Sequence, residues 1–165
     1  MAITTTSDIV GNAVASPQNL SSSPHAGGAL RVAVATIEIA ASGDFNATTD
    51  YLHIVDLPSG ARVHDIVDDG DAIGTAVTAD FGIFETDGTI KDGSAFGNNV
   101  TITSANGTSA YGAVGIDNLN DALWEHATGY ADQQSAPSML SLMASYATGT
   151  AGTGTLVVTV TYSTG

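Results

Sequence analysis

Short runs of β-branched residues, each ended by a turn signal, constrain the fold of this chain more than any other feature. In the run TLVVTVTY near the C-terminus, Leu156, Val158, Val160 and Tyr162 share one face of the expected strand. Alternation with a period of two is typical of an antiparallel strand with one buried face. The chain shows no regular alternation of strands with long helices, so an α/β enzyme fold is not expected.

Seven or eight such strands and a single helix are expected along the chain. The helix is expected over residues 116–129, where Leu119 and Leu123 recur at helical spacing, with Asp117 or Asn118 as its cap and Gly129 at its end. The strands predict an all-β fold, an antiparallel β-sandwich that is jelly-roll-like, over residues 29–165. The expected strands are 30–40, 51–57, 61–67, 76–85, 99–103, 111–116, 138–147 and 155–162.

The first expected strand contains a change of phase. Leu30, Val32 and Val34 alternate, but Ile37 and Ile39 fall out of step with them. An extra residue in one strand of a pair produces such a shift, so we expect a β-bulge near positions 35 and 36.

Several segments are expected to form hairpins or tight turns. Residues 51–57 and 61–67 flank a Pro-Ser-Gly turn, which predicts that they pair with each other. The Gly/Thr-rich segment 148–155 is expected to be the loop of a hairpin between the last two strands, and Asp-Gly after residue 86 is a tight-turn signal. The residues expected to shape turns are Pro58, Gly60, Asp87 and Gly88.

Residues 1–28 differ in composition from the rest of the chain. They are rich in Ser, Thr, Asn, Ala and Gly, and they contain few apolar residues. Such a segment cannot form its own core, so we expect an extended arm that is ordered mainly by contact with another molecule. Residues 22–28 are its expected hinge. The apolar residues expected to make the contact are Ile3, Ile9, Val10, Val14 and Leu20.

The charge of the chain argues against several classes of partner. Seventeen acidic residues face only three basic ones, Arg31, Arg62 and Lys91, and the net charge is −14. Binding of nucleic acids or anionic membranes requires Lys and Arg, so neither partner is expected. The chain has no cysteine, which excludes disulfides and Cys-ligated zinc. Because the N-terminus lacks a basic region and an apolar core, synthesis in the cytosol without secretory export is expected.

Two histidines and an aspartate are the main candidates for a metal site. If the expected hairpin forms, His53 and His64 become diagonal neighbours on one face, about 7 Å apart, with Asp68 close by. Zinc accepts such ligands, but no HExxH-type spacing supports the site. The alternative is a solvated sheet face. We therefore expect no metal and no cofactor. The candidate ligands, if a metal did bind, are His53, His64 and Asp68.

Other chemistry has little support in the sequence. The Asp-rich loops at 68–71 and 87–93 lack EF-hand spacing, so a cation at a subunit contact is only an alternative to ordinary acidic turns. No G-x-S-x-G motif is present, and no enzyme activity is expected. Trp124 and Tyr130 offer an aromatic platform for a sugar, although a lone Trp is more often part of a core.

The motifs DYLHIVDLPSGARVHDIV, FGIFETDG and TLVVTVTY together resemble small virion structural proteins of tailed phages, in particular head decoration (cement) proteins. The resemblance covers roughly residues 30–162 and is carried by structural rather than catalytic motifs. It implies that residues 82–88 form the second strand of the pattern and its turn, and that the first turn is shaped by Leu57, Pro58, Gly60, Ala61 and Val63. His53 and His64 are not part of the pattern.

The resemblance implies a non-enzymatic protein, made in the host cytoplasm, that binds the major capsid protein on the outer surface of the head. It would stabilise contacts between capsomers as a homo-oligomer, a trimer at three-fold positions of the lattice, with the arm as its anchor. Two alternatives stay open. One is a tail or fibre component, and the other is a carbohydrate- or cation-binding β-sandwich module.

Overall fold

The fold was obtained as a computed structural model, which describes residues 30–41, 43–71, 73–102, 108–109 and 121–164. Strands dominate this part of the chain, and none of its helices is long and apolar enough to cross a membrane. In chain order the elements are β1 (Leu30–Ile39), β2 (Tyr51–Pro58), β3 (Ala61–Gly70), β4 (Gly74–Phe84), β5 (Ile90–Thr101), β6 (Thr108–Ser109), α2 (Leu123–His126), β7 (Met139–Ala151) and β8 (Gly154–Thr164).

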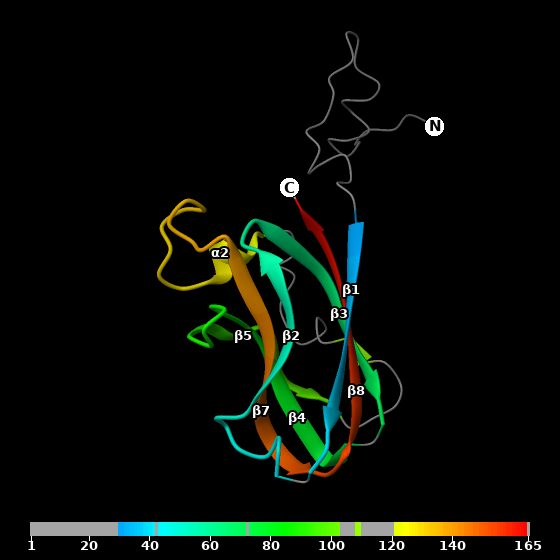
Figure 1. The fold of residues 1–165 in the computed structure, drawn as a ribbon. Helices are drawn as coiled ribbons and strands as arrows, with labels where there is room; N and C mark the ends of the chain where they lie inside the picture. Colours follow the sequence, from blue (N-terminus) through cyan, green and yellow to red (C-terminus); the bar gives the residue numbers. More distant parts are fainter. Residues whose placement is uncertain (1–29, 42, 72, 103–107, 110–120, 165) are drawn as a thin grey trace, which may run out of the picture.

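The strands form two four-stranded antiparallel sheets that lie face to face (Figure 1). The first sheet has the order β1-β8-β3-β6, and the second has the order β2-β7-β4-β5. The antiparallel pairs β1–β8, β2–β7, β3–β6 and β4–β5 are nested, as if one long hairpin had been folded across itself. This nesting is the topology of a jelly roll. The prediction of an all-β, jelly-roll-like sandwich with a short helix is confirmed.

An apolar core fills the space between the two sheets. In β8, Leu156, Val158 and Val160 are buried, whereas the residues between them are partly exposed. In β4, Phe81 and Ile83 are fully buried and enter the same core from the other sheet. Burial of each large apolar side chain contributes roughly 1.5–3 kcal/mol. In these two strands, the residues that alternate with a period of two in the sequence are therefore the ones that face the core.

The strand β1 is regular, so the predicted bulge is wrong. It pairs with β8 along its whole length without a register shift. Ile39 is buried and Ile37 packs against the core, whereas Leu30, Val32 and Val34 point outward into solvent. The change of phase in the sequence arises because apolar residues occupy opposite faces of the two halves of the strand.

Both predicted hairpins are wrong in the same way. The turn after β2 leads into β3, but β2 lies in the second sheet and β3 in the first. The segment after β7 likewise carries the chain from the second sheet to the first. A turn between two alternating strands does not specify whether the chain stays in one sheet or crosses to the facing one, because both arrangements bury the same apolar residues.

Two other boundaries differ from the predictions. The strand β5 begins at Ile90 rather than at Asn99, because pairing with β4 stabilises a glycine-rich segment that has low intrinsic β propensity. Asp121 and Ala122 lie outside a helix, so the described helix begins only at Leu123. The predicted strand at 111–116 and the predicted helix cap lie outside the described residues.

Candidate docking surface

The two histidines that were candidate metal ligands lie in different sheets, His53 on β2 and His64 on β3. His53 Nε2 lies 2.9 Å from Asp56 Oδ1, and His64 Nε2 lies 2.8 Å from Ser163 Oγ. In the described part of the chain, no three His, Asp or Glu side chains come together as a metal-binding group. The expected diagonal pair of histidines is wrong, because it required a hairpin between β2 and β3.

Asp68 is the third candidate ligand, and it points into the protein. The pairing of β3 with β8 shifts register between Val63 and Asp65, with His64 as the extra residue. The shift changes which residues of β3 face inward. Ile66 and Asp68 are therefore buried, and Asp68 is 1% exposed. Neither carboxylate oxygen has a hydrogen-bond partner among the described residues, and burial raises the pKa of Asp68 to about 6.

The aspartates of the β4–β5 hairpin, Asp87 and Asp92, stabilise local turns of the backbone. Asp87 Oδ1 accepts a hydrogen bond from the Thr89 backbone N–H at 2.9 Å, and this bond holds the pKa of Asp87 below its usual range. Gly88 follows with φ of +91°, a conformation that favours glycine. Asp92 Oδ1 accepts from the Ser94 N–H in the same manner. These carboxylates bind local backbone groups instead of converging on a common point.

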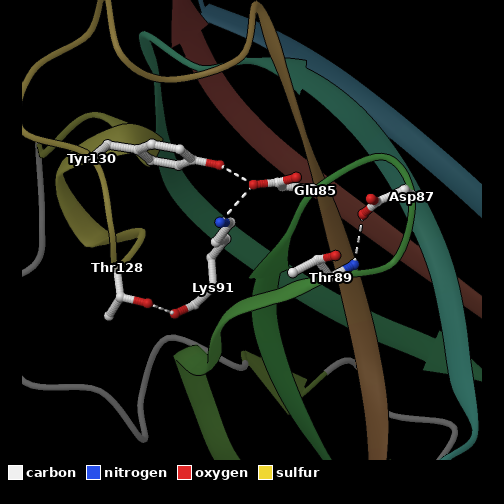
Figure 2. Close-up of polar contacts among 6 residues, drawn as sticks. All are labelled: Glu85, Asp87, Thr89, Lys91, Thr128 and Tyr130. Atoms are coloured by element: carbon white, nitrogen blue, oxygen red, sulfur yellow. Dashed lines mark hydrogen bonds and ion pairs between the residues drawn. The ribbon is translucent and has the colours of Figure 1, made fainter.

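A polar cluster holds the start of β5 against the rest of the molecule (Figure 2). Lys91 Nζ lies 2.5 Å from Glu85 Oε1, and the Tyr130 hydroxyl donates to the same oxygen at 2.6 Å. The ion pair with Lys91 lowers the pKa of Glu85 and raises that of Lys91. The Thr128 hydroxyl donates to the Lys91 carbonyl oxygen at 2.6 Å. The segment after α2 therefore covers this end of the second sheet.

A cavity of about 550 Å³ opens beside the turn between β2 and β3. Pro58 and Gly60 line it together with Arg62, Trp124 and Gln133. The suggested platform of Trp124 with Tyr130 does not use both rings here, because the Tyr130 hydroxyl bonds to Glu85 and Tyr130 is not among the residues that line the cavity.

The free edge of the first sheet presents a row of exposed apolar side chains. Leu30, Val32 and Val34 on β1 are 67%, 62% and 62% exposed. Across the pairing with β8, Val32 lies opposite Thr161 and Val34 opposite Thr159, so threonine side chains flank the row. Among the described strands, β1 pairs only with β8, and its other side is an open edge. We call this surface, made by Leu30, Val32 and Val34, the β1 edge.

The β1 edge is the feature that best fits a docking surface. Sheet edges present unpaired backbone groups, and exposed apolar rows mark sites of interaction. The alternation of these three residues is visible in the sequence, but it is equally consistent with a strand face that is buried in the core. The signal that separates the two readings is the pairing with Thr159 and Thr161, which only the fold reveals. The predicted contact residues of the arm, from Ile3 to Leu20, lie outside the described residues.

No model of a known protein family matches the chain, and no curated protein is detectably similar to it. A chain in the capsid asymmetric unit of cyanophage Pam1 superposes with a TM-score of 0.56 at 17% sequence identity. The match covers 84% of this chain and 87% of that one. A chain in the capsid of Ralstonia phage GP4 matches with a TM-score of 0.38 at 20% identity over 82% and 85% of the two chains. The Pam1 chain shares the fold of this protein.

Proposed function

We propose that this protein is a structural component of a tailed-phage virion that attaches to the outside of the head and strengthens contacts between capsomers. The observation that carries the proposal is the fold shared with a chain in the Pam1 capsid asymmetric unit, over most of both chains. The sequence motifs that resemble decoration proteins lead to the same role independently. The proposed partner is the major capsid protein, the proposed assembly is a homotrimer, and no catalytic residue is needed.

The surface of the molecule supports attachment. The β1 edge offers apolar side chains and open backbone groups on one side of the sandwich. A net charge of −14 favours solubility, and the β1 edge, made by three uncharged side chains, is a place where contact costs little repulsion. A protein on the outer surface of a head meets no packaged DNA, which is consistent with only three Lys and Arg residues.

The direct test is decoration of purified heads that lack this protein. The intact chain should saturate the heads and appear on their outer surface in a reconstruction. A variant without residues 2–28 should fold but bind heads at least tenfold more weakly, because the arm contributes to the anchor. Intact protein that labels the tail or fibres and leaves heads bare would favour the alternative of a tail component.

One observation favours a second candidate, a saccharide-binding module. The cavity beside the β2–β3 turn is lined by an aromatic residue, Trp124, and by the polar residues Arg62 and Gln133. Jelly rolls also occur among lectins. Trp124 is the only tryptophan, so its fluorescence reports on this cavity alone. Titration with a panel of neutral and acidic oligosaccharides should leave the emission unchanged if the protein is only a structural component.

A further inference from the structure

We propose that residues 3–10 of a neighbouring copy add to the β1 edge as an extra antiparallel strand of the first sheet. The inference rests on the proposed role in attachment and deepens it, because it names what the arm binds. In this arrangement the arm ties copies of the protein to one another, and the linked copies then attach to the head together.

The receiving surface is suited to an added strand. β1 is ten residues long and pairs with β8 without a register shift, so its open side offers a regular row of backbone donors and acceptors. Its outward face carries Leu30, Val32 and Val34, with Glu38 at the far end bound to Thr155 at 2.7 Å. Added strands gain affinity from such backbone bonds and specificity from alternate side chains.

The arm contains one segment with the composition of a strand. Residues 3–10 read ITTTSDIV, which is β-branched at six of eight positions and has neither proline nor glycine. Thr, Ile and Val are the residues that favour extended strands. Later parts of the arm are interrupted by Gly11, Pro17 and Pro24, so they are less suited to continuous pairing.

Charge favours the arm over the body of a second copy as the occupant of the β1 edge. Of the seventeen acidic residues, only Asp8 precedes Leu30, so the arm meets little repulsion from the acidic sandwich. Arg31 is exposed on β1, on the face opposite to Leu30, and has no ion pair among the described residues. An antiparallel pair that sets Asp8 opposite Arg31 brings opposite charges together across the strands.

The same register also matches the apolar residues. With Asp8 opposite Arg31, Ile9 lies opposite Leu30, Ser7 opposite Val32 and Thr5 opposite Val34, all on the outward face of the sheet. Ile9 then covers Leu30, which is the most exposed of the three apolar residues in the row. This one register therefore pairs Asp8 with Arg31 and also brings Ile9 onto Leu30.

The length of the arm allows exchange between copies. Residues 11–29 connect the added strand to β1 of their own chain, and at about 3.3 Å per extended residue they reach roughly 60 Å. A head-to-tail contact of this kind, in which each copy gives its arm to the next, generates a ring when the rotation between neighbouring copies closes. The proposed trimer is such a ring.

Disulfide crosslinking between introduced cysteines tests the proposal. Because the chain has no cysteine of its own, only the introduced ones can react. One full-length chain carries Val32→Cys, and a second, distinguishable by a mass tag, carries Ser7→Cys. The two are mixed without heads, under mild oxidation, and disulfide formation is followed by electrophoresis and mass spectrometry. The control replaces Ser7→Cys by Thr6→Cys, which the register places on the opposite face. We expect the Ser7→Cys pair to crosslink at least tenfold faster than the Thr6→Cys pair.

Three outcomes would overturn the proposal. The first is equal crosslinking of Ser7→Cys and Thr6→Cys, and the second is fast self-crosslinking of Val32→Cys chains, which indicates direct pairing of two β1 edges. The third is that a further variant, which carries both Ser7→Cys and Val32→Cys, crosslinks only within its own chain. Charge exchange gives a second readout. Arg31→Asp should slow the crosslink about threefold, and adding Asp8→Arg on the arm should restore it. Because no heads are present, this test can fail while decoration succeeds, and the reverse is also true.

Discussion

One edge strand of the first sheet, β1, and one edge strand of the second sheet, β5, differ in how they are protected. The pairing of β5 with β4 shifts register at three places, and the start of β5 is held by the Lys91–Glu85 ion pair and by Thr128. β1 has no register shift and carries three exposed apolar residues in a row. Register shifts, charged side chains and covering loops are the usual means by which proteins prevent edge-to-edge association.

The contrast teaches that edge protection in this molecule is selective. The same chain that closes the β5 edge leaves the β1 edge regular, apolar and open. Although the chain has seventeen acidic residues, none of them occupies position 30, 32 or 34 on the outward face of β1. An unprotected edge carries a risk of aggregation, so its retention is best explained by a partner that covers it.

The largest expected effect comes from adding charge to the β1 edge. Val32→Lys combined with Val34→Lys should convert the proposed trimer to monomers in solution, because lysines on an edge strand block the apolar contact. Both side chains face solvent, so the melting temperature should change by no more than a few degrees. Light scattering measures the mass, and Ile90→Lys, at a 53% exposed site on β5, is the matched control.

The second prediction disrupts the β5 edge. A Cβ on Gly82 would lie 2.4 Å from the Asp92 carbonyl oxygen and from the Gly93 carbonyl carbon, so Gly82→Ala must push β5 away from β4. The expected loss is about 3 kcal/mol in the free energy of unfolding, measured by chemical denaturation. In the control Gly93→Ala, the added Cβ meets only the Ile90 side chain at 3.6 Å. Equal losses in the two variants would show that the backbones do not pack this closely.

The third prediction concerns Asp68, which lies inside the sheet that β1 borders. Burial raises its pKa to about 6 in the folded protein, from an ordinary value near 4. The folded state then holds the proton more tightly than the unfolded chain, so stability falls as the pH rises from about 4 to 6 and stays lower above that.

Asp68→Asn should remove this pH dependence and raise the stability at pH 7 by up to about 3 kcal/mol, at about 1.4 kcal/mol per pKa unit. Thermal unfolding between pH 4 and 8 measures the effect. Asp121→Asn, at an exposed position, controls for the loss of one negative charge. A pH profile that keeps its slope in Asp68→Asn would assign the dependence to other carboxylates.

The smallest expected effect tests the cover on β5. Thr128→Ala removes the hydroxyl that donates to the Lys91 carbonyl oxygen. Because one intramolecular hydrogen bond contributes only about 1 kcal/mol net, amide exchange around residues 90–94 should accelerate several-fold. Exchange in β1 should stay the same. If the two edges responded alike, the local cover would not be what distinguishes them.

The sequence predicts the class of fold because most of its strands follow a simple period. The runs around Phe81 and Val158 alternate cleanly, and the structure buries the predicted faces. Alternation does not specify which strands pair. It therefore predicts hairpins of β2 with β3 and of β7 with β8, whereas each of these pairs spans both sheets. Pairing depends on contacts between distant segments, which local alternation does not encode.

The candidate site shows the same limit. The extra residue at His64 turns Asp68 inward, and nothing in ARVHDIVDDG marks that position as a bulge. Along β1, the outward Leu30 and Val34 and the inward Ile37 are all apolar, so hydrophobicity alone cannot tell the faces apart. The free edge becomes recognisable only when the order of strands is known.

The central claim is that the β1 edge is the surface through which this protein is built into the virion. Quantitative decoration of heads with the intact chain, the Val32→Lys/Val34→Lys variant and the Ile90→Lys variant tests it most directly. We predict that the β1 variant binds at least a hundredfold more weakly than the intact chain, while the Ile90→Lys variant saturates the heads normally. Equal decoration by all three proteins would contradict the claim.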